Sequence, residues 1–109
     1  MRVLKFIVDE QILKQDPNCD FSGLIPGSEQ FLKASFTFSS EWKSCTKAIA
    51  FFSRLGAEYP PCLLKDGISC TIPSEAVNAK YFKIQVIGKN KDGLKMLTNK
   101  IEICQNGGD

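Results

Sequence analysis

Residues 31–39 read Phe-Leu-Lys-Ala-Ser-Phe-Thr-Phe-Ser, and from Leu32 onward apolar and polar side chains alternate. A period of two residues is the pattern of a strand with one face buried. The polar stretch Ser40-Glu-Trp-Lys43 separates this run from a second apolar run at residues 46–53. We therefore predict an all-β fold in which the two runs form a hairpin over residues 30–53.

Similar strand patterns recur along the rest of the chain, separated by turn formers such as Asp66-Gly67 and Asp92-Gly93. The further expected strands are residues 2–8, 11–14, 58–64, 68–72, 80–88 and 94–104. Short strands at intervals of about 8–12 residues are typical of sandwiches and barrels. We predict an antiparallel β-sandwich, immunoglobulin-like or jelly-roll-like, of about seven to eight strands, with one helical turn at residues 73–78.

The chain is 109 residues long, which is the size of one domain. We predict a single β-sandwich domain at residues 1–104 and a flexible C-terminal tail at 105–109, where Gln-Asn-Gly-Gly-Asp contains no apolar side chain. The residues expected to face the core are Phe6, Phe36, Phe38, Phe82, Ile84, Val86, Ile101 and Ile103.

Charge and hydropathy exclude several classes of protein. The net charge is only +2, and the arginines that favour phosphate and base recognition are few, which argues against a nucleic-acid partner. No apolar run reaches the ~20 residues needed to cross a bilayer, so we expect no membrane partner. The first residues, Met1 to Asp9, carry only a short apolar stretch broken by Lys5, and we expect no signal peptide.

The sequence offers no catalytic or metal-binding pattern. Histidine is absent, which removes the usual general base at neutral pH. The cysteines, at positions 19, 45, 62, 70 and 104, contain no Cys-x-x-Cys pair. We therefore expect no enzyme activity, no metal and no cofactor, and thiols that are reduced. A three-residue turn at 65–67 would set Cys62 opposite Cys70, whereas a two-residue turn at 66–67 would separate them.

The aromatic residues are the best candidates for contact with a partner. Trp42 lies between two expected strands, where it either caps the core or anchors a partner protein. Tyr59, Pro60 and Pro61 allow the same two interpretations. Consecutive prolines cannot donate hydrogen bonds to a neighbouring strand, so we place them at a sheet edge. We take Trp42, Tyr59, Pro60 and Pro61 as the candidate protein interface.

Several of these segments together resemble a known type of protein. They are Gly23-Leu-Ile-Pro-Gly27, residues 31–39, Glu41-Trp42, residues 47–52 (Lys-Ala-Ile-Ala-Phe-Phe), residues 70–76 (Cys-Thr-Ile-Pro-Ser-Glu-Ala), residues 82–88 (Phe-Lys-Ile-Gln-Val-Ile-Gly) and Thr98-Asn99. Their order resembles that of small β-modules encoded by phages and prophages of Firmicutes, which are similar to the N-terminal domain of phage baseplate upper proteins. The resemblance covers nearly the whole chain and consists of strands and turns.

The resemblance implies a phage structural or assembly protein, a baseplate, tail or head-fibre attachment module that acts by protein–protein contacts. Its partners would be other phage structural subunits and further copies of itself, through an edge strand, in the virion or the host cytoplasm. The alternative is a small phage-encoded inhibitor that binds a host defence enzyme or sequesters a nucleotide signal. In that case Lys33, Lys43, Lys47, Lys83 and Lys89 would line an anion site instead of simply facing solvent.

Overall fold

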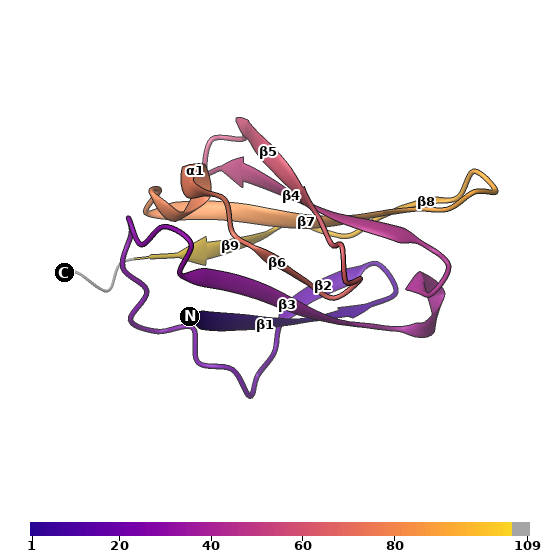
Figure 1. Ribbon diagram of the computed structural model, residues 1–109, viewed down its shortest axis with the longest axis horizontal. Coiled ribbons are helices and arrows are strands. Elements are labelled where there is room, and N and C mark those ends of the chain that lie inside the picture. The colour runs from indigo at the N-terminus through magenta and orange to yellow at the C-terminus, as the bar shows by residue number, and fades with distance from the viewer. Residues whose placement is uncertain (106–109) are drawn as a thin grey trace.

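The computed structural model describes residues 1–105, which fold as two packed β-sheets, and the all-β sandwich prediction is confirmed (Figure 1). The strands are β1 (Arg2–Asp9), β2 (Ile12–Gln15), β3 (Leu32–Phe38), β4 (Thr46–Ser53), β5 (Glu58–Leu63), β6 (Ser69–Thr71), β7 (Tyr81–Lys89), β8 (Lys95–Leu97) and β9 (Ile101–Cys104). The first sheet has the order β2-β1-β3-β6. The second has the order β5-β4-β7-β8, with β9 also paired to β7.

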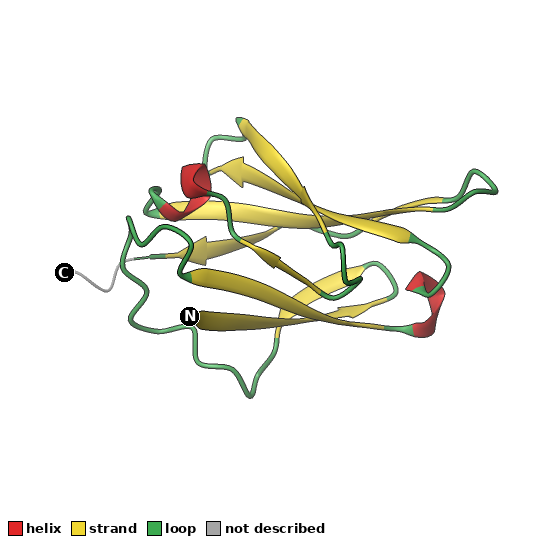
Figure 2. Cartoon of the chain, viewed as in Figure 1, coloured by secondary structure: helices red, strands yellow, loops and turns green. Residues whose placement is uncertain are grey.

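Two short helices connect the sheets (Figure 2). The first is a 3-10 helix at Ser40–Trp42, between β3 and β4, which we did not predict. The second is α1 (Ser74–Val77), which lies within the helical turn predicted at residues 73–78. Pro73 precedes α1 in an extended conformation and its carbonyl accepts the first helical hydrogen bonds.

The predicted hairpin at residues 30–53 is wrong, although both of its strands exist. β3 belongs to the first sheet, where it pairs with β1 and β6, and β4 belongs to the second, where it pairs with β5 and β7. The 3-10 helix carries the chain from one sheet to the other. The two apolar runs therefore face each other across the core instead of lying side by side.

One pairing differs from the predicted antiparallel arrangement, because β1 and β3 pair in parallel from Arg2 opposite Leu32 to Val8 opposite Phe38. β2 folds back on one side of β1, and the loop that follows returns the chain to the other side. That loop is fastened to the sheet by Arg2, whose guanidinium donates hydrogen bonds to the carbonyls of Asp20 at 2.9 Å and Ser22.

The last predicted strand, 94–104, is divided into β8 and β9, both of which pair with β7. The interruption has a physical cause at Thr98 and Asn99. The Thr98 hydroxyl accepts a hydrogen bond from the Val86 N–H at 3.0 Å. The Asn99 side chain bonds both backbone groups of Leu13 in the first sheet, at 2.7 and 3.1 Å. The segment between β8 and β9 thus connects the two sheets.

Most of the predicted core is confirmed, since Phe6, Phe36, Phe82, Ile84, Val86 and Ile103 are buried. Phe38 and Ile101 are only partly buried and pack against the edge of the core.

Gln105 does not belong to a frayed tail, so the predicted tail boundary is wrong. Its side chain is fully buried, and its amide nitrogen lies 3.0 Å from the Val77 carbonyl and 2.9 Å from that of Ala79. Val77 is the last residue of α1 and Ala79 lies two residues beyond it, where the end of a helix leaves carbonyls without helical partners. The polar side chain therefore closes the end of the helix. The rest of the predicted tail, residues 106–109, lies outside the described residues.

Trp42 packs against the second sheet where the chain crosses between the layers. Its indole N–H donates a 2.7 Å hydrogen bond to the Glu10 carbonyl in the β1–β2 turn. A Cβ added at Gly88 in β7 would lie 2.7 and 2.9 Å from two atoms of the indole ring. Only glycine leaves room for the ring at this position.

We expect Gly88→Ala to destabilise the protein by about 1–3 kcal/mol, because the added methyl overlaps the indole. Trp42→Phe alone should also destabilise, because it removes ring atoms and the bond to Glu10. Chemical denaturation of both single variants and the double variant provides the measurement. The double variant should lose less stability than the sum of the two single-variant losses, since the smaller ring makes room for the methyl. Strict additivity would contradict this account.

Candidate functional site

The described part of the chain holds no group of three or more Cys, His, Asp or Glu residues placed to bind a metal ion. No helix within residues 1–105 is long and apolar enough to cross a membrane. The candidate sites described below are surface hollows and exposed apolar side chains.

Only part of the predicted interface lies on the surface. Trp42 is fully buried, so its prediction as a partner anchor is wrong and its interpretation as a core residue holds. Tyr59 packs against the edge of the core. Pro60 and Pro61 are exposed on β5, an edge strand of the second sheet as expected from the missing N–H groups. The ladder between β4 and β5 is irregular at these prolines.

The outer face of the second sheet is the side that points away from the core, and one half of it is covered by charged side chains. The Lys100 ammonium lies 4.0 Å from the centre of the Phe52 ring, and the Arg54 guanidinium lies 4.0 Å from that of Tyr81. Arg54 also pairs with Glu102 at 3.3 Å. The aromatic rings of this half are thus shielded by cations held over them.

The other half of the outer face has an apolar row across four strands. The strand registers align Leu63 with Ala48, Ala48 with Ile87, and Ile87 with Leu97. Leu63 is 53% exposed and Leu97 40% exposed. We call these four residues the apolar row. Side chains on the solvent face of a sandwich are commonly polar, so a continuous row of this kind indicates a contact surface.

A hollow of about 560 Å³ lies over Leu63, Ala48 and Ile87 of the apolar row and is charged differently at its two ends. Lys89 and Lys91 line it beside the start of β4, since Lys89 is aligned with Thr46. Glu58 lines it toward the other end of β4, where it is aligned with Phe52. Six residues of strand span about 20 Å. Opposite charges therefore flank the hollow along the direction of β4.

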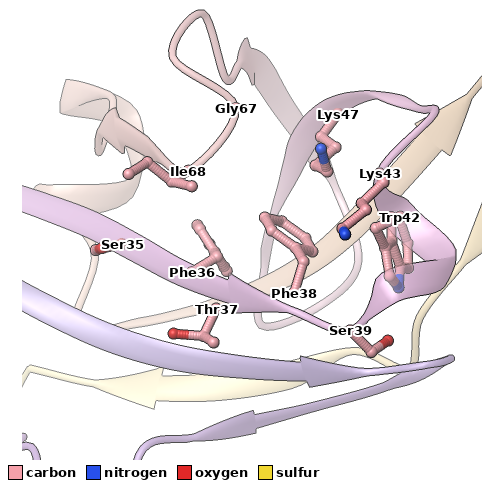
Figure 3. Close-up of a pocket in the computed structure, with 10 residues that line it drawn as sticks. All are labelled: Ser35, Phe36, Thr37, Phe38, Ser39, Trp42, Lys43, Lys47, Gly67 and Ile68. Carbon is pink, nitrogen blue, oxygen red and sulfur yellow. The ribbon is translucent and has the colours of Figure 1, made fainter.

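A second hollow, of about 410 Å³, opens between the sheets beside Phe38 (Figure 3). The ladder between β6 and β3 ends at Ser35 and is followed by one backbone bond of 2.8 Å from the Phe36 N–H to the Ile68 carbonyl, so the sandwich edge is uncovered beyond Phe36. The Phe38 ring stacks on Phe36, with ring centres 5.9 Å apart. The Lys47 ammonium lies 5.1 Å from the Phe38 ring centre, and Lys43 lines the same opening. None of the lining residues is acidic, which makes the hollow cationic.

The lysines named for an anion site do not gather at one place. Lys43 and Lys47 line the hollow beside Phe38, Lys89 lines the hollow over the apolar row, and Lys33 lines a third hollow near β6. Lys83 lies on the outer face of the second sheet, aligned with Phe52. The prediction of one anion site lined by all five is therefore wrong.

Cys62 and Cys70 lie next to each other, although neither of the predicted hairpin registers forms. Cys62 is in β5 of the second sheet and Cys70 in β6 of the first. Both are free thiols. Burial raises the pKa of Cys70 to about 12, and the neighbouring Cys62 adds to the rise. Burial also raises the pKa of Cys62, while its hydrogen bond with Cys70 opposes the rise.

Asp66 holds the turn that brings Ile68 to the hollow beside Phe38. Its carboxylate accepts hydrogen bonds from the N–H groups of Ile68 at 3.0 Å and Ser69 at 2.7 Å, and from the Ser69 hydroxyl. These donors, the hydroxyl foremost, lower the pKa of Asp66 to about 2. The hollow therefore has one wall fixed by an ionised side chain.

The comparisons with known proteins identify no family for this chain. No family model matches the chain, and neither the curated proteins nor the solved structures contain a match.

The apolar row was not predicted from the sequence, although a signal for it exists. The run Ala48-Ile-Ala-Phe-Phe52 is apolar at both alternating positions. Such a run predicts a strand with both faces covered. In the described residues no further element covers the outer side of the row, as Figure 1 shows for β4 and β7.

We expect Ser69→Ala to raise the pKa of Asp66 from about 2 toward the reference value of 3.8, because the hydroxyl is its strongest lowering contact. Since the folded-state value lies below the unfolded one, the carboxylate stabilises the fold above about pH 4, and that stabilisation is lost as the pH falls toward 2. NMR titration of the Asp66 carboxyl carbon measures the shift. Ser74→Ala, whose hydroxyl contacts Glu75, is the control. An unchanged Asp66 titration in Ser69→Ala would refute the assignment.

Proposed function

We propose that this protein is a structural or assembly module that acts through protein–protein contacts and not through catalysis. The observation that carries the proposal is the apolar row across β5, β4, β7 and β8. Full burial of a leucine or isoleucine side chain stabilises a complex by up to about 1.5–3 kcal/mol, and an alanine contributes less. The four side chains of the row supply a continuous contact strip.

The partner we propose is a second copy of the chain, because the charges around the hollow are self-complementary. A two-fold axis through the middle of β4 would set Glu58 of each copy against Lys89 and Lys91 of the other. The same rotation would bring the two apolar rows together. Two-fold interfaces, in which both copies use the same patch, are the commonest in homo-oligomers.

The face of the second sheet is a better contact than the edge of β5. Pro60 and Pro61 have no N–H to offer an added strand, and the ladder is irregular beside them. Pro61 instead lines the hollow over the apolar row, so this part of the predicted interface contributes through its apolar surface.

The sequence resemblance to phage β-modules supports a role in a phage particle, as an attachment module of the baseplate, tail or head-fibre type. Other phage structural subunits would then be further partners, and the protein would be found in the virion or in the host cytoplasm before assembly. Mass spectrometry of purified particles tests this part of the proposal, and absence from them would remove the virion role.

We expect the protein to dimerise in sedimentation-equilibrium experiments and Leu63→Asp to weaken the dimer about tenfold or more, because it places a carboxylate in the apolar row. The matched control is Ile12→Asp. Ile12 is 63% exposed on β2 in the first sheet, and its replacement should leave association unchanged. A chain that stays monomeric, or equal effects of both variants, would contradict the proposal.

A charge exchange tests the two-fold arrangement itself. Glu58→Lys should weaken the dimer, and adding Lys89→Glu and Lys91→Glu to the same chain should restore it. If the triple variant keeps an unchanged circular dichroism spectrum but does not recover dimerisation, this arrangement is excluded.

A second candidate function, the capture of a nucleotide signal, is favoured by the hollow beside Phe38. Lys43 and Lys47 offer two cations to a phosphate, and the Phe38 ring offers a surface on which a base can stack. Lys47 is held over the ring and by a 3.3 Å bond to the Cys45 carbonyl. To reach a bound anion, the Lys47 ammonium would turn away from the Phe38 ring and the Cys45 carbonyl.

For this candidate we expect AMP to bind more tightly than inorganic phosphate in calorimetric titrations, because only AMP can stack on Phe38. Lys47→Gln should weaken AMP binding about tenfold, through loss of a charged hydrogen bond. Lys83→Gln, on the outer face of the second sheet, is the matched control. Equal binding of AMP and phosphate, insensitive to Lys47, would exclude the candidate.

A further inference from the structure

Cys62 and Cys70 are two thiols that lie where an edge of one sheet meets an edge of the other. Cys62 is aligned with Ile49 inside the second sheet, and Cys70 with Ala34 inside the first. Cys62 packs against the core cluster that contains Cys70, and the Cys62 sulfur lies 3.4 Å from the carbonyl of Thr71, the residue that follows Cys70. No backbone ladder joins β5 to β6.

Both thiols line a hollow of about 550 Å³ that also contains Lys33, Lys65 and Asp66. Cys62 is half-buried, whereas Cys70 is 9% exposed. A reagent entering the hollow therefore meets Cys62 first. The charges acting on the pair are mixed. Lys33 favours the thiolate of Cys70, Asp66 opposes it, and Glu75 opposes that of Cys62.

We propose that Cys62 and Cys70 form a disulfide modification site that covalently joins the two sheets on reaction with a small-molecule disulfide such as oxidised glutathione. A disulfide needs two cysteines that lie close together in the fold, which sequence spacing alone does not provide. Here Cys62 and Cys70 line the same hollow, and the Cys62 sulfur lies 3.4 Å from the backbone beside Cys70. A disulfide formed here closes the chain between β5 and β6, at an edge where the sheets share no ladder.

The reaction proceeds by two thiol–disulfide exchanges. Cys62 loses its proton, and its thiolate attacks one sulfur of oxidised glutathione. This breaks the glutathione disulfide, forms a mixed disulfide and releases one glutathione thiolate, which takes up a proton. Cys70 then loses its proton and attacks the Cys62 sulfur, releasing the second glutathione. Two protein thiols are oxidised by two electrons, and one glutathione disulfide is reduced to two thiols.

The high pKa values of the pair set the conditions of the reaction. Because the attacking species is the thiolate, closure is slow at neutral pH and faster in alkaline solution. Cys70 is close to its target when the mixed disulfide forms, so its attack is intramolecular. The glutathione adduct on Cys62 is therefore short-lived in the wild-type chain and accumulates when Cys70 is replaced.

The test is incubation of the full chain with oxidised glutathione at alkaline pH, followed by blocking of free thiols and non-reducing peptide mapping. We expect a Cys62–Cys70 linkage, and a thermal unfolding midpoint raised by on the order of 10 °C that dithiothreitol reverses. Cys70→Ser should instead keep a glutathione adduct on Cys62. The chain with Cys19, Cys45 and Cys104 replaced by Ser should still form the linkage.

Linkage of Cys62 or Cys70 to any other cysteine, or stable glutathione adducts without a linkage in the wild-type chain, would overturn the proposal. So would a Cys62 and Cys70 pair that stays reduced while Cys19 reacts under the same conditions. This test does not depend on the proposed function, because the linkage is read from peptide masses whatever the oligomeric state.

Discussion

The contact between Trp42 and Gly88 is the constraint on which the two-sheet arrangement depends. The chain leaves the first sheet at Phe38 and enters the second at Thr46, and the 3-10 helix between them places the indole against β7. The indole N–H bonds to the Glu10 carbonyl in the β1–β2 turn. One side chain thus connects the first hairpin, the crossing segment and the central strand of the second sheet.

The candidate contact surfaces follow from this arrangement. Because β3 and β4 lie in different sheets, β4 occupies a position between β5 and β7. Ala48 then joins Leu63 and Ile87 on the outer face. The same crossing leaves the sandwich edge uncovered beside Phe38, since neither β6 nor β5 extends along it. Both hollows are thus consequences of one connection.

The periodicity of the sequence predicts some features of this structure and not others. Alternation identifies which residues share a face, and it correctly placed Phe82, Ile84 and Val86 in the core. It carries no information on which strand pairs with which. A polar link of a few residues fits both a hairpin and a crossing between sheets, so the pairing of β3 was predicted incorrectly. The parallel pairing of β1 with β3 has no local signal.

The candidate sites were harder to predict than the fold, because they depend on single side chains. Trp42 was considered for the surface, and the space opposite it at Gly88 is visible only in three dimensions. The cysteine pair was suggested by the turn at 65–67 but arises from contact between sheets. Gln105 was assigned to the tail from its polar neighbours, although its buried amide donates hydrogen bonds to the carbonyls at the end of α1.

The strand order also determines how the chain must fold. Three pairs, β1 with β2, β4 with β5 and β7 with β8, are neighbours in sequence and can form as local hairpins. The pairs that unite them, β1 with β3 and β4 with β7, require distant segments to meet. Loop-closure entropy must be overcome before these contacts form, which slows folding. During synthesis, the edge of β4 that pairs with β7 therefore stays without its partner strand until residues 81–89 have been made.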